Sequence, residues 1–200
     1  ISIMLSAINS VDYTIFHAVN QYASHVKPLD SLMVFFADYA QYVLIVLLGL
    51  FLLINKNGSR VVAFQALCAC ATGVIINKVI SLFAYRDRPF ISHHVNQLID
   101  HAANSSFPSD HATSALVITF TIWLHFKRSG RMWVVMGVLI AFSRVWVGVH
   151  YPFDVLTGAV LGCVLALFIH YVIFNTKLMR AITNLSIFRK SAYDEQSQYY

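Results

Sequence analysis

The sequence predicts an all-α integral membrane helical bundle with five to six transmembrane helices. Of its 200 residues, 58% are hydrophobic and only 12% are charged, whereas soluble domains carry about 25% charged residues. Mean hydropathy is +0.65, and several apolar stretches approach the roughly 20 residues that cross a bilayer. The net charge of +5 comes from short basic clusters between these stretches, a pattern that indicates membrane orientation rather than nucleic-acid binding.

The apolar stretches divide the chain into three parts. Residues 1–26 read as an amphipathic helix, either interfacial or an additional span, because apolar side chains recur there every three or four positions. Residues 27–176 form a membrane-embedded domain, and residues 177–200 form a basic and polar cytoplasmic tail. The five expected spans are Leu29–Ile54, Val61–Tyr85, His111–Phe126, Met132–Val149 and Pro152–Phe174.

The basic loops orient this bundle. Lys127, Arg128 and Arg131 fill the third connection, and further basic residues flank the first connection and follow the last span. In a five-span arrangement these regions share one side, which the positive-inside rule makes cytoplasmic. The connection 86–108 and the turn around His150 then face outward. Because charges near a bilayer are costly, those in the outer connections call for a functional explanation.

Three polar stretches meet at the outer end: YRDRPF at 85–90, FPSDH at 107–111 and SRVWVGVHYPFD at 143–154. Arginine forks match phosphate oxygens, and histidine exchanges protons near neutral pH. Helices that begin at FPSDH and at HYP would also point their N-termini, which favour anions, at this place. The sequence therefore predicts an anion site with acid–base capacity, contributed by Arg88, Ser109, His111, Arg144, His150 and Asp154.

These stretches resemble the three-part signature of the type 2 phosphatidic acid phosphatase superfamily. Its pattern is Lys-x6-Arg-Pro, then Pro-Ser-Gly-His, then Ser-Arg-x5-His-x3-Asp. Here the third element, which starts at Ser143, matches at every fixed position. Two positions depart from the pattern: Asp110 replaces the glycine, and Ser81 stands where the lysine is expected. Lys78 and Arg86 are the candidates for the missing positive charge.

The whole chain resembles the bacitracin-resistance branch of that superfamily, which consists of undecaprenyl-diphosphate phosphatases. The resemblance implies a membrane core of that type and three catalytic residues. His150 would be the nucleophile, Asp154 would fix its tautomer, and His111 would protonate the leaving group. The substrate-binding residues would be Arg88, Ser109, Arg144 and Lys78.

The resemblance also sets the expected partners. They are a polyprenyl diphosphate and the bilayer of a bacterial cytoplasmic membrane, with the active site outward and no nucleic acid. No metal or other cofactor is expected, because arginines supply the positive charge. The carboxylate of Asp110 would repel an anion bound beside it, so we expect it to turn outward and either cap its helix or pair with Arg86.

Three other interpretations stay open. The same pocket suits a phosphatase for phosphatidate or phosphatidylglycerol phosphate. A membrane subunit of a bacitracin exporter is a non-enzymatic alternative, although the chain has no Gly-x4-Gly-Lys nucleotide-binding loop. A metal site in the loop is the third, but the histidines there lack tight ligand spacing, so we expect them to line the cavity mouth or to be solvated. The loop residues concerned are His93, His94, Asp100 and His101.

Overall fold

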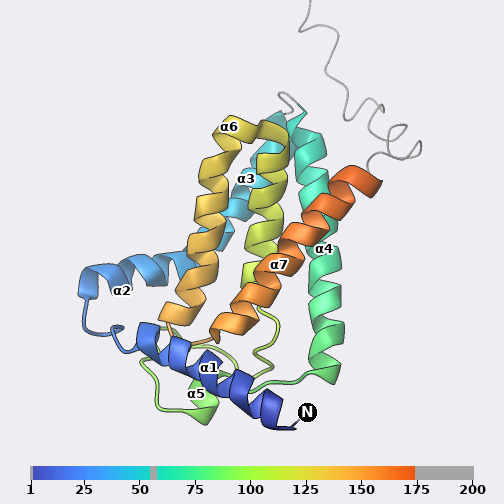
Figure 1. The fold of residues 1–200 in the computed structure, drawn as a ribbon. Coiled ribbons are helices and arrows are strands. Elements are labelled where there is room, and N and C mark those ends of the chain that lie inside the picture. The colour runs from blue at the N-terminus through green and yellow to red at the C-terminus, as the bar shows by residue number, and fades with distance from the viewer. Residues whose placement is uncertain (1, 55–57, 174–200) are drawn as a thin grey trace, which may run out of the picture.

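The computed structural model describes residues 2–54 and 58–173, and every regular element in these ranges is helical (Figure 1). The predicted all-α class is confirmed for this part of the chain, whereas the predicted tail 177–200 lies outside it. The α-helices are α1 (Ser2–Asn20), α2 (Lys27–Val34), α3 (Ala40–Ile54), α4 (Ser59–Phe83), α5 (Pro89–Ser92), α6 (Asp110–Trp146) and α7 (Pro152–Phe168). Two π-helical turns are η1 (Phe35–Tyr39) and η2 (Ile169–Ile173).

Three helical segments are long and apolar enough to cross a membrane: Lys27–Ile54, Ser59–Phe83 and Pro152–Val172. They correspond to the first, second and fifth predicted spans. The third and fourth predicted spans are the two arms of α6, which folds back on itself (Figure 1). The backbone breaks at Lys127, where φ is 31° and ψ is −91°.

The first arm of α6 lies inside the bundle. Nearly every side chain from Ala112 to Leu124 is buried, including the hydroxyls of Thr113, Thr119 and Thr121. A helix surrounded by other helices can carry polar residues that a lipid-facing helix could not. This position explains why the arm is less apolar than the three segments named above.

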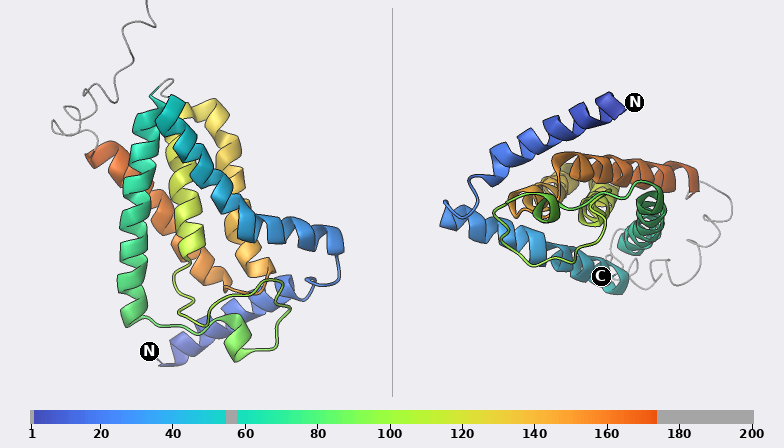
Figure 2. Two further views of the ribbon diagram at one scale, coloured as in Figure 1. Left: turned by 180° about the vertical axis from the view of Figure 1, so that it is seen from behind. Right: turned by 90° about the horizontal axis from the view of Figure 1, so that it is seen from below.

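The first span is bent. At η1 the backbone N–H of Ala40 donates to the carbonyl of Phe35, five residues back, and such wide turns interrupt the regular helix. As a result α2 lies across one end of the bundle, whereas α3 rises along it (Figures 1 and 2). The sequence predicts one span here and does not predict the bend.

Helix α1 packs across the same end of the bundle (Figure 2). Within the part of α1 whose side chains are described, residues 9–20, the buried residues are Asp12, Phe16 and Asn20, spaced by four. In contrast, Val11 is 52% exposed and Ile15 is 43% exposed. Within the predicted segment 1–26, Ser2–Asn20 is helical, and part of its apolar side chains face away from the bundle.

Polar contacts explain which face of α1 is buried. The side chain of Asn20 donates to the carbonyls of Asn96 and Trp146, both at 2.9 Å. It also accepts from the backbone N–H of Asn96 at 2.9 Å. Because buried backbone groups need hydrogen-bond partners, these contacts fix the C-terminal end of α1 on the bundle.

Helix α7 packs closely on the start of α6. A Cβ atom on Gly158 would lie 2.6 Å from the carbonyl oxygen of Ser109, and one on Gly162 would lie 2.6 Å from that of Thr113. Such a Gly-x3-Gly spacing is typical of close helix contacts in membranes. The first turns of α6 and α7 therefore lie side by side.

The turn of α6, the C-terminal end of α3 and the start of α4 lie at one end of the bundle, whereas α1, α5 and the connection between α6 and α7 lie at the other (Figure 1). The basic turn around Lys127 is thus separated from the polar constellation by the length of the bundle.

Candidate active site

A cavity of about 290 Å³ lies between α4, the loop that follows α5 and the start of α6. It contains four of the residues predicted from the sequence: Lys78, Arg88, His111 and His150. The other residues that line it are Asn77, Ser81, Leu82, Tyr85, His101, Asn104, Ser105, Phe107, Pro108 and Asp110.

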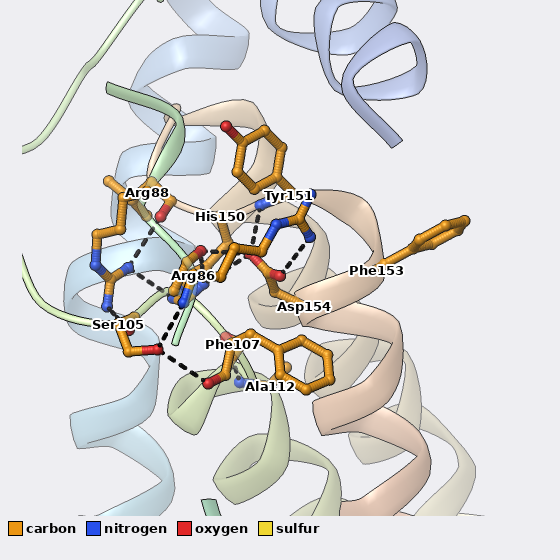
Figure 3. Close-up of polar contacts among 12 residues, drawn as sticks. Arg86, Arg88, Ser105, Phe107, Ala112, His150, Tyr151, Phe153 and Asp154 are labelled. Carbon is orange, nitrogen blue, oxygen red and sulfur yellow. Dashed lines mark hydrogen bonds and ion pairs between the residues drawn. The ribbon is translucent and has the colours of Figure 1, made fainter. Parts of the chain in front are cut away.

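The guanidinium of Arg88 is held in place by loop groups and by His150 (Figure 3). Its Nε and Nη2 donate to Asn104 Oδ1 at 3.0 and 2.8 Å, and its Nη1 donates to the carbonyl of Val149 at 2.9 Å. The same Nη1 lies 3.0 Å from His150 Nε2. Because arginine only donates hydrogen bonds, Nε2 accepts, and the ring proton of neutral His150 lies on Nδ1.

His150 is held in its neutral form. Burial lowers the pKa of this histidine to about 4, and the positive charges of Arg88 and Arg144 act in the same direction. The neighbouring carboxylate of Asp154 opposes the shift only in part. At neutral pH the ring therefore carries an unprotonated Nε2 at the cavity, which is the form that a nucleophile needs.

Ser106 lies between His150 and Asp154. Its Oγ is 3.3 Å from His150 Nδ1 and donates a short hydrogen bond to Asp154 Oδ2. The direct distance from His150 Nδ1 to Asp154 Oδ2 is 3.7 Å. The structure thus places Asp154 beside the histidine, as the sequence predicts, but links the two through a serine hydroxyl that sequence analysis missed.

Arg86 binds carboxylates rather than the cavity. Its Nη1 lies 2.7 Å from Asp12 Oδ2 and 2.8 Å from Asp154 Oδ1, and its guanidinium lies 4.0 Å above the ring of Tyr151 (Figure 3). Of the two candidates for the missing charge, Lys78 is the one on the cavity wall.

The prediction that Asp110 caps its helix or pairs with Arg86 is wrong. Asp110 lines the cavity, and its Oδ1 accepts a hydrogen bond from Asn77 Nδ2 at 2.8 Å. The helix cap is Ser109, and Arg86 is engaged by other carboxylates. The amide of Asn77 satisfies the carboxylate beside the anion site.

Ser109 is fully buried, and its hydroxyl accepts from the N–H of Ala112 at 3.4 Å. The predicted cap of α6 is therefore confirmed, whereas the cavity wall is formed by Ser105 instead. No spacing rule in the sequence marked Ser105 or Asn104, because both lie in an irregular loop.

Arg144 is 1% exposed. Its Nη1 donates to the carbonyl of Ala37 at 2.8 Å, and its positive charge acts on both His150 and His101. Among the described residues, its Nε and Nη2 have no hydrogen-bond partner. Buried donors of this kind are rare in proteins.

The loop histidines are separated. His101 lines the cavity, with its ring centre 6.3 Å from that of His150, and burial lowers its pKa. His93 instead stacks on Tyr13 of α1 at 4.0 Å between ring centres. Within residues 2–54 and 58–173, no three histidine, cysteine, aspartate or glutamate side chains are grouped as metal ligands.

A helical bundle with membrane-length helices, whose cavity brings His111 and His150 together with the buried Arg88, is the arrangement expected of a membrane-embedded phosphatase. The sequence profile described as the PAP2 superfamily matches residues 62–178, which include all three signature stretches. The chain belongs to this superfamily.

Characterised relatives agree. The chain is 41% identical over 157 residues to undecaprenyl-diphosphatase BcrC of Bacillus subtilis, covering 78% of this chain and 80% of that protein. It is 34% identical over 157 residues to a protein of Bacillus licheniformis named bacitracin transport permease protein BcrC, covering 78% and 77%. The resemblance to the bacitracin-resistance branch is confirmed, and the chain is an enzyme of the phosphatase class.

Solved structures share the fold. The crystal structure of Aquifex aeolicus LpxE superposes with a TM-score of 0.69 at 25% identity, covering 79% of this chain and 93% of that one. The transmembrane PAP2-type phosphatidylglycerolphosphate phosphatase of Bacillus subtilis gives a TM-score of 0.63 at 26% identity, covering 82% and 85%.

Proposed function

We propose that the protein is an undecaprenyl-diphosphate phosphatase that removes the terminal phosphate at the outer face of a bacterial cytoplasmic membrane. The product would be undecaprenyl phosphate, the carrier of cell-wall precursors, and competition with bacitracin for the diphosphate would raise resistance. The observation that carries the chemistry is the arrangement of His150, whose Nε2 accepts from Arg88 while its Nδ1 faces Ser106 and Asp154. The substrate is supported by the name of the Bacillus subtilis relative.

In the first step His150 Nε2 attacks the terminal phosphorus. The new N–P bond forms as the bridging P–O bond breaks, and the bond's electron pair leaves with the lipid monophosphate oxygen. His111, which lines the same cavity, donates a proton to that oxygen. Arg88 transfers its hydrogen bond from Nε2 to a phosphate oxygen as the histidine becomes phosphorylated.

In the second step water hydrolyses the phosphohistidine. His111, now neutral, takes a proton from the water as its oxygen attacks phosphorus, and the N–P bond breaks with its electron pair returning to Nε2. Inorganic phosphate leaves, and both histidines regain their starting forms. The positive charge on the phosphorylated ring is stabilised by Asp154 through Ser106.

Arginines supply the charge for binding the phosphate. Two buried donors of Arg144 lack a partner among the described residues, and equatorial phosphate oxygens are the acceptors that match an arginine fork. Lys78 lines the cavity from α4. Each step above runs on protein side chains and water, so the proposed reaction needs no metal.

The outward orientation rests on the basic turn of α6. Lys127, Arg128 and Arg131 lie at the end of the bundle opposite the cavity (Figure 1), and basic loops favour the cytoplasmic side. Five spans, with α1 lying at the outer interface, are the arrangement that we propose for the chain.

The test is phosphate release from undecaprenyl diphosphate in detergent with excess EDTA, comparing the parent with His150→Ala. Release by the parent alone is expected. Release by both proteins would exclude His150 as the nucleophile, and loss of the parent's activity in EDTA would exclude metal independence.

Two alternatives are distinguished by a resistance measurement on the same variant and by a second substrate. A relative named as a permease favours a transport role, and such a protein would confer bacitracin resistance equally well with His150→Ala. The likeness to a phosphatidylglycerolphosphate phosphatase favours a glycerolipid substrate. That substrate would then be hydrolysed with the higher kcat/KM.

A further inference from the structure

Helix α1 reaches the active site through one buried carboxylate. Asp12 is fully buried, and its Oδ2 lies 2.7 Å from Arg86 Nη1. The same nitrogen lies 2.8 Å from Asp154 Oδ1. Arg86 therefore bridges two carboxylates, one from α1 and one from the catalytic group.

The second oxygen of Asp12 is also engaged. Its Oδ1 accepts from the backbone N–H of Phe153 at 2.9 Å, in the first turn of α7, where free N–H groups favour a negative charge. Asp12 is thus fixed at two points, both adjacent to Asp154 in space or in sequence.

The charge count at this cluster has a consequence for His150. Phosphorylation of Nε2 makes the ring cationic, and Asp154 is the anion beside it. Arg86 alone would cancel the charge of Asp154, whereas two carboxylates around one guanidinium leave one net negative charge. At low effective dielectric this difference acts strongly across a few ångströms.

We propose that Asp12 is a positioning residue of the active site, which holds Arg86 so that Asp154 keeps its orientation and its net negative charge toward His150. Helix α1 then contributes a positioning residue to the catalytic site and does not only attach the N-terminus to the bundle. This inference rests on the proposed phosphohistidine mechanism. It extends that mechanism to Asp12, which precedes His150 by 138 positions along the chain.

The variants separate charge from structure. Asp12→Asn keeps the shape and removes the charge, and Asp12→Asn with Arg86→Gln removes both charges and restores one net negative charge at Asp154. The matched control is Asn20→Ala, which breaks the other attachment of α1, to Asn96 and Trp146, and removes none of the contacts among Asp12, Arg86 and Asp154. All three are compared with the parent in kcat, KM and melting temperature.

For Asp12→Asn we expect kcat to fall about 10- to 100-fold, as when a hydrogen-bonded partner of an active-site ligand is removed, with KM within about twofold. The double variant should recover part of that loss. Asn20→Ala should lower the melting temperature with little change in kcat. Equal losses of kcat in Asp12→Asn and Asn20→Ala, or no recovery in the double variant, would overturn the proposal.

A second readout does not depend on the substrate. The pKa of His150, followed by NMR of the ring nitrogens, should be lower in Asp12→Asn than in the parent and should rise again in the double variant. An unchanged pKa would overturn the role of Asp12 even in an active enzyme. Failure of the proposed function would appear separately, as phosphate release that survives His150→Ala.

Discussion

The backbone N–H of Ser109 donates to the backbone carbonyl of Asp154 across 3.1 Å. This bond joins the residue that caps α6 to the first turn of α7, so the two helix N-termini open side by side at the catalytic cluster. Close packing one turn further along α7 keeps them there, since Gly158 leaves no room for a side chain next to Ser109.

Gly158→Ala should therefore disturb the site through packing. The new methyl would lie 2.6 Å from the carbonyl of Ser109, and overpacking of this kind costs about 1–3 kcal/mol. We expect a lower melting temperature and a lower kcat. Gly49→Ala is the matched control, because nothing lies within 4 Å of its added Cβ. Equal melting temperatures for the two variants would contradict this view of the helix contact.

Ser106→Ala should uncouple His150 from Asp154. The direct distance of 3.7 Å is too long for a hydrogen bond, so the histidine proton loses its acceptor. We expect kcat to fall by about 10- to 100-fold with KM little changed. Ser59→Ala provides the control, since Ser59 is also buried and its hydroxyl donates to the carbonyl of Phe51. A kcat for Ser106→Ala equal to that of the control would show that the serine plays no part.

Lys78→Met should weaken substrate binding, because its ammonium is the cavity's only contribution of positive charge from α4 among the described residues. Loss of a charged contact to phosphate raises KM by about tenfold, with a smaller effect on kcat. Lys27→Met, an exposed lysine at the start of α2, controls for the loss of charge. An unchanged KM would show that Lys78 does not supply the positive charge of the missing signature lysine.

The pH profile should show a nucleophile that stays neutral in acid. Because the pKa of His150 is lowered to about 4, the acid limb of kcat/KM assigned to this residue should lie near pH 4 rather than near 6.5.

The same pKa shift affects the stability of the fold. Between pH 6.5 and 4 the unfolded chain binds a proton at His150 and the folded chain does not, so stability falls as the pH drops through that window. Measurements of kcat/KM and of the free energy of unfolding between pH 3.5 and 8 test the two predictions. An acid limb at pH 6.5 would show that His150 is not held neutral by burial.

Sequence analysis predicted the candidate site from residues that follow helix ends at fixed spacings. Arg88, His111 and His150 stand beside helix termini that any bundle of this order brings to one end, and all three line the cavity. The parts it missed depend on tertiary contacts. Ser106 lies in an irregular loop, and nothing in its neighbours marks it as the bridge to Asp154.

Long-range pairing explains the other differences. The apolar spacing on α1 gave no sign that Asp12 is buried, which it is because Arg86 and the start of α7 bind it. Those partners lie 74 and 141 residues away along the chain. Local periodicity carries no information about such contacts. The expected pairing of Asp110 with Arg86 was wrong for the same reason, since Arg86 binds Asp12 and Asp154.

Leu82 both lines the cavity and is 79% exposed on the outside of α4. The reaction chamber is therefore continuous with the flank of the bundle that faces hydrocarbon in the proposed arrangement. A lipid can turn only its headgroup into the protein while its tail stays dissolved in the bilayer, and the product can diffuse away in two dimensions. The enzyme then recognises its substrate by the phosphates, and the length of the lipid tail beyond the first few carbons should have little effect on kcat/KM.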